Sequence, residues 1–359
     1  MMNLFSRVDW RIFLPALFLS ILGSLVLSSV APNSFPKQFI YLALALFAFL
    51  LFSKIDLKVL RSFAPWFYAG SIVLLVATIL FGAVTRGAAR WIVIGPFNLQ
   101  PSEITKPFLL IFFAWLVSGT SGPKKFLVTT LFALLAFFLI LNQPDLGSGL
   151  VIMAGFLGVI FMGRIPVVYL FLGLIFVAFF SPIGWHFLAD YQRQRVISFL
   201  SPESDPLGSG YNALQAVIAV GSGMLTGRGL GGGTQSQLAF LPERQTDFIF
   251  SALAEELGFL GAGMLLLAFV LLFWRIIMIL KNTEDIFSRA FLGGAFLVLF
   301  SQTFVNIGMN LGILPITGIP LPFVSAGGSS LVSMSTLLGM ISSISSDLAK
   351  RDSLGIIHG

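Results

Sequence analysis

Long apolar runs, separated by short polar segments, repeat along most of this chain. A run of about 17 to 25 apolar residues is long enough to cross the hydrocarbon core of a bilayer, which is about 30 Å thick. The pattern therefore predicts an all-α polytopic membrane protein with about ten transmembrane helices. The predicted spans are residues 12–30, 37–53, 66–83, 102–118, 126–141, 148–163, 166–181, 250–280, 288–311 and 324–346.

Composition supports this class and excludes several kinds of chemistry. Of the 359 residues, 57% are hydrophobic and only 10% are charged, and the mean hydropathy is +0.97. The chain has no Cys, which excludes disulfides, thiol catalysis and thiolate zinc sites, and two His cannot build a histidine-rich metal site. The first span resembles a signal peptide, but its apolar run of about 19 residues is too long for one, so we expect an anchor.

The positions of Lys and Arg predict the orientation of the chain. If the N-terminus is cytoplasmic, the short outer loops hold only Lys37, Arg86 and Arg90. A strong excess of cations on one side is typical of the cytoplasmic face, so both termini are expected there. The net charge of +6 then reports topology rather than nucleic-acid binding. The inner side collects Arg7, Arg11, Lys54, Lys58, Arg61, Lys124, Lys125, Arg164, Arg275, Lys281, Arg289, Lys350 and Arg351.

One long outer segment, residues 182–246, interrupts the regular alternation between spans seven and eight. Its residues 185–200 mix aromatic, apolar and basic side chains as an interfacial helix does, and residues 211–223 predict a second short helix. No internal repeat is visible, so residues 1–359 are expected to form a single transmembrane domain. The sequence Gly-Arg-Gly-Leu-Gly-Gly at 227–232 matches a dinucleotide fingerprint, but no strand precedes it, so we reject that function.

Ionisable residues stand at the outer ends of several predicted spans. In Gln-Pro-Ser-Glu-Ile-Thr-Lys (100–106), Glu103 and Lys106 are three residues apart and can pair on one helix face, either as a simple ion pair or as a substrate contact. Asp247 directly precedes an apolar run, where it is either a helix N-cap or a functional carboxylate. Glu255 and Glu256 lie deeper in that run, and we expect one of them to be hydrogen-bonded within the bundle.

Four longer motifs resemble one family. They are "GTQSQLAFLPERQTDFIFSALAEELGFLG" (233–261), "QPSEITK", "NQPDLGSGLV" (142–151) and "PITGIPLPFVSAGGSSL" (315–331). Together they resemble the SEDS family (shape, elongation, division and sporulation), and "GTQSQ" resembles its elongation branch. The resemblance extends over all ten predicted spans. One departure is Ala326, which stands where relatives usually carry Tyr.

The resemblance implies a peptidoglycan glycosyltransferase that joins lipid II units at the outer face of the bacterial cytoplasmic membrane, for cell elongation and rod shape. It implies that Asp247 is catalytic. An inverting transfer from a pyrophosphate needs one base and no protonated leaving group, unlike glycoside hydrolysis. The expected substrate-binding residues are Glu103, Lys106, Arg90, Arg244, Gln215, Gln237, Gly327, Gly328, Ser329 and Ser330.

The same resemblance sets expectations for cofactors and partners. No metal site of the protein is expected, although the chemistry leaves room for Mg²⁺ or Mn²⁺ at the substrate pyrophosphate. Expected partners are lipid II, a class B penicillin-binding protein transpeptidase, other membrane proteins of the elongation complex, and membrane lipid, but no nucleic acid. The alternatives are a lipid II flippase or transporter, a division-type polymerase, and a scaffold without catalytic activity.

Overall fold

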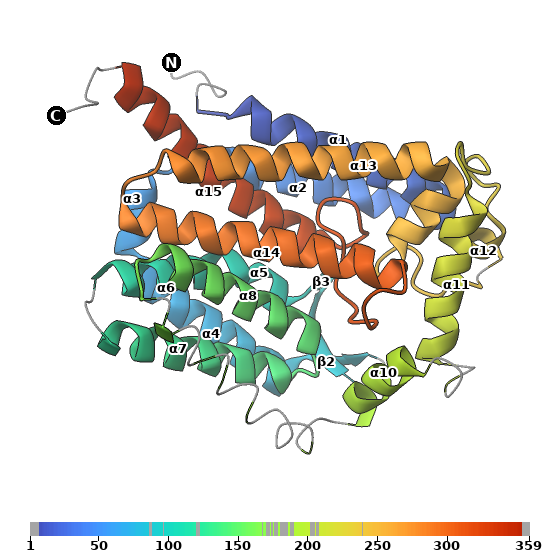
Figure 1. The fold of residues 1–359 in the computed structure, drawn as a ribbon, viewed down its shortest axis with the longest axis horizontal. Helices are drawn as coiled ribbons and strands as arrows, with labels where there is room; N and C mark the ends of the chain where they lie inside the picture. The colour runs from blue at the N-terminus through green and yellow to red at the C-terminus, as the bar shows by residue number, and fades with distance from the viewer. Residues whose placement is uncertain are drawn as a thin grey trace.

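The computed structural model is a bundle of long helices with a smaller helical and stranded cap at one end (Figure 1). It describes residues 7–85, 88–95, 97–119, 123–166, 190–201, 208–238 and 240–353, together with a few isolated residues between 168 and 205. The long elements are α1 (Trp10–Val30), α2 (Phe35–Lys54), α4 (Ala64–Phe81), α5 (Pro101–Ile104) with α6 (Lys106–Gly119), α7 (Pro123–Leu141), α8 (Leu146–Met162), α13 (Ile249–Lys281), α14 (Ile286–Asn310) and α15 (Gly328–Ser353).

These helices confirm the predicted polytopic membrane fold. Within the described residues, eight helices are long and apolar enough to cross a membrane, with α5 and α6 taken together, and α8 is a shorter apolar helix. The predicted span 166–181 falls largely outside the described residues. The described start of the chain, just before α1, and the C-terminal end of α15 lie at the same end of the bundle, which also carries the short helix α3 (Leu57–Ser62) (Figure 1).

The opposite end carries the cap. It contains the amphipathic helix α10 (Asp190–Leu200), α11 (Ser209–Ser222) and the short helix α12 (Thr234–Gln237) (Figure 1). The predictions for 185–200 and 211–223 are therefore confirmed where residues are described. The cap also holds an antiparallel sheet, ordered β1-β2-β3, that we did not predict. Its strands β1 (Ala83–Thr85), β2 (Ala88–Ile94) and β3 (Phe97–Leu99) are too short to stand out beside the apolar spans.

Small residues let two central helices approach closely. A Cβ at Gly158 of α8 would overlap the carbonyl of Gly293 in α14. A Cβ at Gly155 would lie 2.6 Å from the side chain of Val298 in α14. Close backbone approach through glycine is a usual way to gain van der Waals contact between helices in a membrane. This packing fixes the position of α14, whose C-terminal end, near the cap, holds two site residues described below.

The helix α13 is broken near its outer end. Gly258 has φ +65° and ψ −165°, which interrupts the helical hydrogen bonds, and residues 223–229 fill the break. The amides of Arg228 and Gly229 donate to the carbonyls of Glu255 and Glu256, each at 3.0 Å, and the amide of Phe259 donates to a carbonyl of the same loop. The glycine-rich sequence at 227–232 is therefore a structural insert.

Both buried acids beside this break have partners. Glu255 accepts hydrogen bonds from the amides of Gln235 and Ser236, at 2.8 and 2.9 Å, and so caps the start of α12. Glu256 accepts from the amide of Gly231 at 3.1 Å and from Ser29 of α1. We expected one of the two acids to be hydrogen-bonded within the bundle, and both are. They hold the loop on the broken helix.

Candidate active site

Asp247 lies in a series of turns that leads into α13. The carbonyl of Glu243 accepts hydrogen bonds from the amides of Thr246, Asp247 and Phe248, at 3.0, 3.1 and 3.3 Å. Glu243 itself has φ +49°, a left-handed conformation that non-glycine residues seldom adopt. The N-cap of α13 is Phe248, and no side chain caps it. The interpretation of Asp247 as an N-cap is therefore wrong.

Two asparagines of α14 hold the backbone of Asp247. Asn306 and Asn310 each donate a side-chain hydrogen bond of 3.0 Å to the Asp247 carbonyl. The side-chain oxygen of Asn310 also accepts from the amide of Ser251 at 3.1 Å, which satisfies a donor in the first turn of α13. These contacts fix the main chain at Asp247 without using its carboxylate.

The surroundings of Asp247 raise the pKa of its carboxyl group to about 6. Burial disfavours the charged form and is the largest cause, and the nearby charge of Glu243 acts in the same direction. Arg195 and Arg90 oppose the rise with their positive charge, and Thr246 opposes it through a hydrogen bond. The positive end of the α13 dipole favours the carboxylate, but the pKa is raised overall because desolvation of this half-buried side chain is the stronger effect.

Arg195 and Arg90 reach this site from separate elements. Arg195, on α10, donates a 3.0 Å hydrogen bond to the carbonyl of Thr317. The next residue, Gly318, has φ +73°, and a Cβ there would lie 3.5 Å from Oδ2 of Asp247. Arg90, on β2, donates to the carbonyls of Gln143 and Pro144, the first at 3.2 Å. The cap and the α7–α8 turn thus place two guanidinium groups near one carboxylate.

The predicted pair on the fourth span forms as expected. Lys106 Nζ and Glu103 Oε1 are 2.6 Å apart, and neither residue is exposed. Ser148 of α8 lies 3.4 Å from the same carboxylate oxygen, and Ser333 of α15 donates to the Glu103 carbonyl at 2.6 Å. The pair therefore joins α5, α6, α8 and α15. Because it is enclosed, a direct contact of Lys106 with substrate stays a prediction.

A second polar network connects this pair to the start of α15. Asp145 caps α8 through the Ser148 amide and accepts hydrogen bonds from Gln100 and Ser102, at 3.0 and 2.8 Å. The backbone amide of Gln100 donates to Ser329 Oγ at 2.9 Å. The other predicted residues of this turn are Gly327, Gly328 and Ser330. A Cβ at Gly328 would overlap the ring of Tyr41. The Ser330 hydroxyl is buried and has no hydrogen-bond partner among the described residues.

Comparison with known proteins decides the family. The model of the cell cycle protein family that comprises FtsW, RodA and SpoVE matches residues 8–350. The chain belongs to this family. It is 42% identical to the peptidoglycan glycosyltransferase MrdB of Escherichia coli K12 over 342 residues, 92% of each chain. It is 30% identical to the peptidoglycan glycosyltransferase RodA of Treponema pallidum, covering 94% of this chain and 98% of the relative.

A solved structure has the same fold as this family member. It is described as "Structural coordination of polymerization and crosslinking by a peptidoglycan synthase complex". The match has a TM-score of 0.82 and 32% sequence identity, and covers 95% of this chain and 98% of the other. The SEDS resemblance inferred from the motifs is therefore confirmed.

Two predicted substrate-binding residues of this FtsW/RodA/SpoVE member, Arg244 and Gln237, make hydrogen bonds to groups other than Asp247. Arg244 donates a 2.9 Å hydrogen bond to the carbonyl of Val30, which ties its loop to the end of α1. Gln237 donates to Ser29 and to Glu256, both at 3.1 Å. Gln215 is half-buried on α11. Their contacts place Arg244 and Gln237 in the fold of the cap, and substrate binding by the three stays a prediction.

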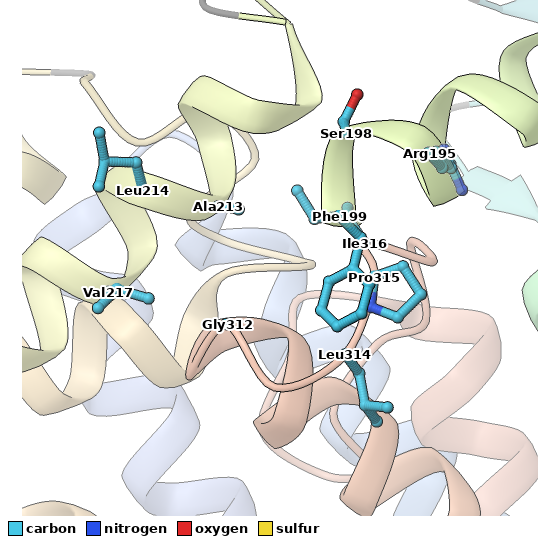
Figure 2. Close-up of a pocket in the computed structure, with 10 residues that line it drawn as sticks. All are labelled: Arg195, Ser198, Phe199, Ala213, Leu214, Val217, Gly312, Leu314, Pro315 and Ile316. Atoms are coloured by element: carbon cyan, nitrogen blue, oxygen red, sulfur yellow. The ribbon is translucent and has the colours of Figure 1, made fainter. Parts of the chain in front are cut away.

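A cavity of about 210 Å³ opens beside the site in this family member. Figure 2 shows that its lining comes from α10, α11 and the loop that follows α14, with Arg195 at one side. The cavity wall is mostly apolar, and Leu214 is 56% exposed.

In the part of the chain that the structure describes, no group of three or more His, Cys, Asp or Glu side chains is placed to hold a metal ion.

Sequence reasoning missed three residues of this site. Asn306 and Asn310 are four residues apart near the end of an apolar span, so they share a helix face. This spacing could have indicated a polar contact at that end of the span. Arg195 lies in a segment that we recognised as interfacial, but only its hydrogen bond to Thr317 places it beside Asp247. The backbone amide of Ala326 donates to the carbonyl of Gln245 at 2.8 Å and so holds this loop to the Asp247 turns.

Proposed function

We propose that this protein is a peptidoglycan glycosyltransferase that polymerises lipid II, with Asp247 as its general base. The observation that carries the proposal is the Asp247 carboxylate, which does not cap α13 and whose pKa is raised to about 6 near two arginines. A base with a pKa close to the operating pH combines a mostly ionised state with effective proton transfer. The names of the MrdB and RodA relatives support the same reaction class.

The proposed reaction needs one proton acceptor. The 4-hydroxyl of the acceptor sugar attacks the anomeric carbon of the donor while Asp247 takes its proton. The bond from that carbon to the pyrophosphate oxygen breaks, and the configuration is inverted in a single displacement. The leaving pyrophosphate keeps its electron pair as an anion and is not protonated. No second carboxylic acid is therefore required, in contrast to glycoside hydrolysis.

Two cations are placed to stabilise the leaving charge. Arg195 and Arg90 both lower the pKa of Asp247, which means that their charges act on the same small region. Positive groups that are already fixed in place stabilise developing negative charge at little reorganisation cost. If Mg²⁺ or Mn²⁺ takes part, we propose that the substrate pyrophosphate and Asp247 hold it, since the described residues form no protein cluster for a metal ion.

The proposed location is the bacterial cytoplasmic membrane. The termini lie at one end of the bundle and the Asp247 turns at the other. Cations lie in the last turns of α2, α3 and α13, at the end with the termini, which is the pattern of a cytoplasmic face. We therefore assign the termini to the cytoplasm and the site to the outer face.

We also propose a crosslinking partner. The matched synthase complex is described as coordinating polymerisation with crosslinking, and this chain covers 98% of the matched chain. A class B penicillin-binding protein would supply the transpeptidase, because the two Ser-x-x-Lys sequences of this chain, at 34–37 and 121–124, are not accompanied by the Lys-Thr-Gly motif of that class. We further propose a role in elongation and rod shape, which is supported by a second matched structure, described as a rod shape determining protein RodA of Thermus thermophilus.

Supplying purified lipid II to the purified protein, alone and with the partner, tests the function. The proposal predicts glycan strands in the detergent-solubilised reaction. A flippase would move lipid II across liposomes without making strands, and a scaffold would do neither. Failure of both preparations to make glycan would overturn the proposal. The hydrogen bonds from loop amides to both oxygens of Glu255 and to Oε1 of Glu256 favour a structural role of these buried acids over a transport path.

A further inference from the structure

A basic cavity lies at the opposite end of the bundle from Asp247. Its volume is about 420 Å³, and its lining comes from the segment before α1, the inner part of α13 and the end of α15. Four cations contribute to it, and Asp9 is the one acid in its lining. The cations are Arg7, Arg11, Arg275 and Lys350, and Ser345 and Ser346 add hydroxyl groups.

The acid in this cavity is already neutralised. Arg275 donates to Oδ2 of Asp9 through Nε and Nη2, at 2.9 and 2.7 Å. Ser345 donates to the same oxygen at 2.6 Å, and the Arg11 amide donates to Oδ1 at 3.0 Å. The Asp9 side chain is only 8% exposed. Asp9 and Arg275 thus form a fixed pair in a lining that carries four cations and one acid.

The remaining cations are arranged to receive an anion. Arg7 uses one N–H group to donate to the carbonyl of Lys54 at 3.0 Å, which positions its guanidinium. Arg11 and Lys350 are both exposed. Three cations and the hydroxyl of Ser346 on one cavity are suited to phosphate oxygens, while the Ser345 hydroxyl is used by Asp9.

Two tryptophans indicate the depth of this cavity in the membrane. Trp10 precedes Arg11 and is 46% exposed, and Trp274 precedes Arg275 and is 58% exposed. Exposed Trp is typical of the level of the lipid head groups. The phosphates of the lipids therefore lie at the height of the cavity. The cytoplasmic leaflet, to which we assign this end, is the one rich in anionic lipid.

We propose that this cavity binds the phosphodiester head group of an anionic phospholipid. The site differs from the glycosyltransferase site and stands whether or not Asp247 is catalytic. Zwitterionic lipids should bind more weakly, because their ammonium group meets the excess of Arg and Lys. Arg7, Arg11 and Lys350 contact the phosphate, while the Asp9–Arg275 pair builds the wall behind it.

Native mass spectrometry of the detergent-solubilised protein tests this site. The protein is titrated with phosphatidylglycerol or with phosphatidylcholine of the same acyl chains, and the dissociation constant of the first bound lipid is measured. The test variant is Arg11→Gln with Lys350→Gln. The matched control is Lys124→Gln with Lys281→Gln, which removes two exposed cations from the same end of the bundle but not from this cavity.

The proposal predicts tighter binding of phosphatidylglycerol than of phosphatidylcholine to the native protein. The dissociation constant for phosphatidylglycerol should rise about 30-fold in the test variant, since each cation near a lipid surface contributes about fivefold. The control variant should change it far less. Equal losses in both variants would show a diffuse charge effect and overturn the site. Equal affinity for both lipids would overturn it, and so would full competition by inorganic phosphate, which would identify a soluble anion as the ligand.

Discussion

At the residue scale, the backbone of Asp247 has a structural role, and its side chain has the proposed chemical role. Its carbonyl accepts two hydrogen bonds from α14, and its carboxylate caps no helix. The sequence indicated this residue because it lies within a motif of the family, at 233–261. The raised pKa of Asp247 could not be predicted from the sequence, because it depends on burial of the side chain and on the charge of Glu243, which the turns bring close.

A change at Glu243 should move the pH dependence of turnover. Asp247 acts as a base only when ionised, so activity should rise with pH and be half-maximal near its pKa of about 6. Glu243→Gln removes a negative charge that raises this pKa, so the rising limb should move to lower pH. The carbonyl of residue 243, which holds the turns, is unchanged. Rates of lipid II polymerisation across pH give the measurement.

The control for this experiment is Glu284→Gln, at the exposed end of the bundle near the termini. It should leave the profile in place. A Glu243→Gln profile that is unchanged, or that moves to higher pH, would contradict the electrostatic account of Asp247.

At the element scale, the Glu103–Lys106 pair holds the outer end of α5 and α6 against α8 and α15. The spacing of three residues predicted the pair correctly. Its full burial was not predictable, because Ser148 and Ser333 come from helices far along the chain. A buried ion pair that loses one partner leaves an uncompensated charge, which typically costs about 3–5 kcal/mol.

We therefore expect Lys106→Met to lower the free energy of unfolding by about that amount. The double variant Glu103→Gln with Lys106→Met should be clearly more stable than Lys106→Met alone, because no buried charge is left unpaired. Unfolding midpoints of the detergent-solubilised proteins give the comparison. If the single and double variants have equal midpoints, the pair does not stabilise this end of the bundle.

The break in α13 makes a second element-scale prediction. Gly258→Ala should destabilise the protein, because φ is +65° there and the new Cβ would overlap the amide of Gly227. The matched change Gly263→Ala meets open space on the same helix and should be neutral or stabilising. Unfolding midpoints again decide. Equal midpoints for the two variants would show that residues 223–229 are not inserted in the helix as described.

At the scale of the whole molecule, hydropathy predicted the spans well and the cap poorly. Apolar runs must cross the bilayer as helices, since every backbone group needs a partner there. The cap has no such constraint, so β1, β2 and β3 were missed. Its long-range contacts, such as Arg195 with Thr317 and Gln237 with Ser29, join residues over 100 positions apart that only the folded chain brings together.

The orientation of the whole molecule is open to a labelling test. The native chain has no Cys, so single cysteines can be introduced without background. Cysteines in place of Asp205 and Gln235 should react with a membrane-impermeant thiol reagent added to intact cells. Cysteines in place of Lys58 and Lys124 should react only after the membrane is opened. Labelling of position 58 from outside would reverse the assigned orientation and place Asp247 on the wrong face for lipid II polymerisation.

The central claim is that the Asp247 carboxylate takes the proton of the attacking hydroxyl. Asp247→Asn tests it most directly, because the substitution keeps the backbone carbonyl that Asn306 and Asn310 hold and removes only the basic oxygen. Asp190→Asn, an exposed change in the same cap, is the control. The measurement is the rate of glycan formation from lipid II by protein whose unfolding midpoint matches the native one.

The account predicts that Asp247→Asn lowers this rate by about 10²- to 10⁴-fold, the usual contribution of a general base, while the control stays near the native rate. A folded Asp247→Asn protein that polymerises lipid II at close to the native rate would contradict the account.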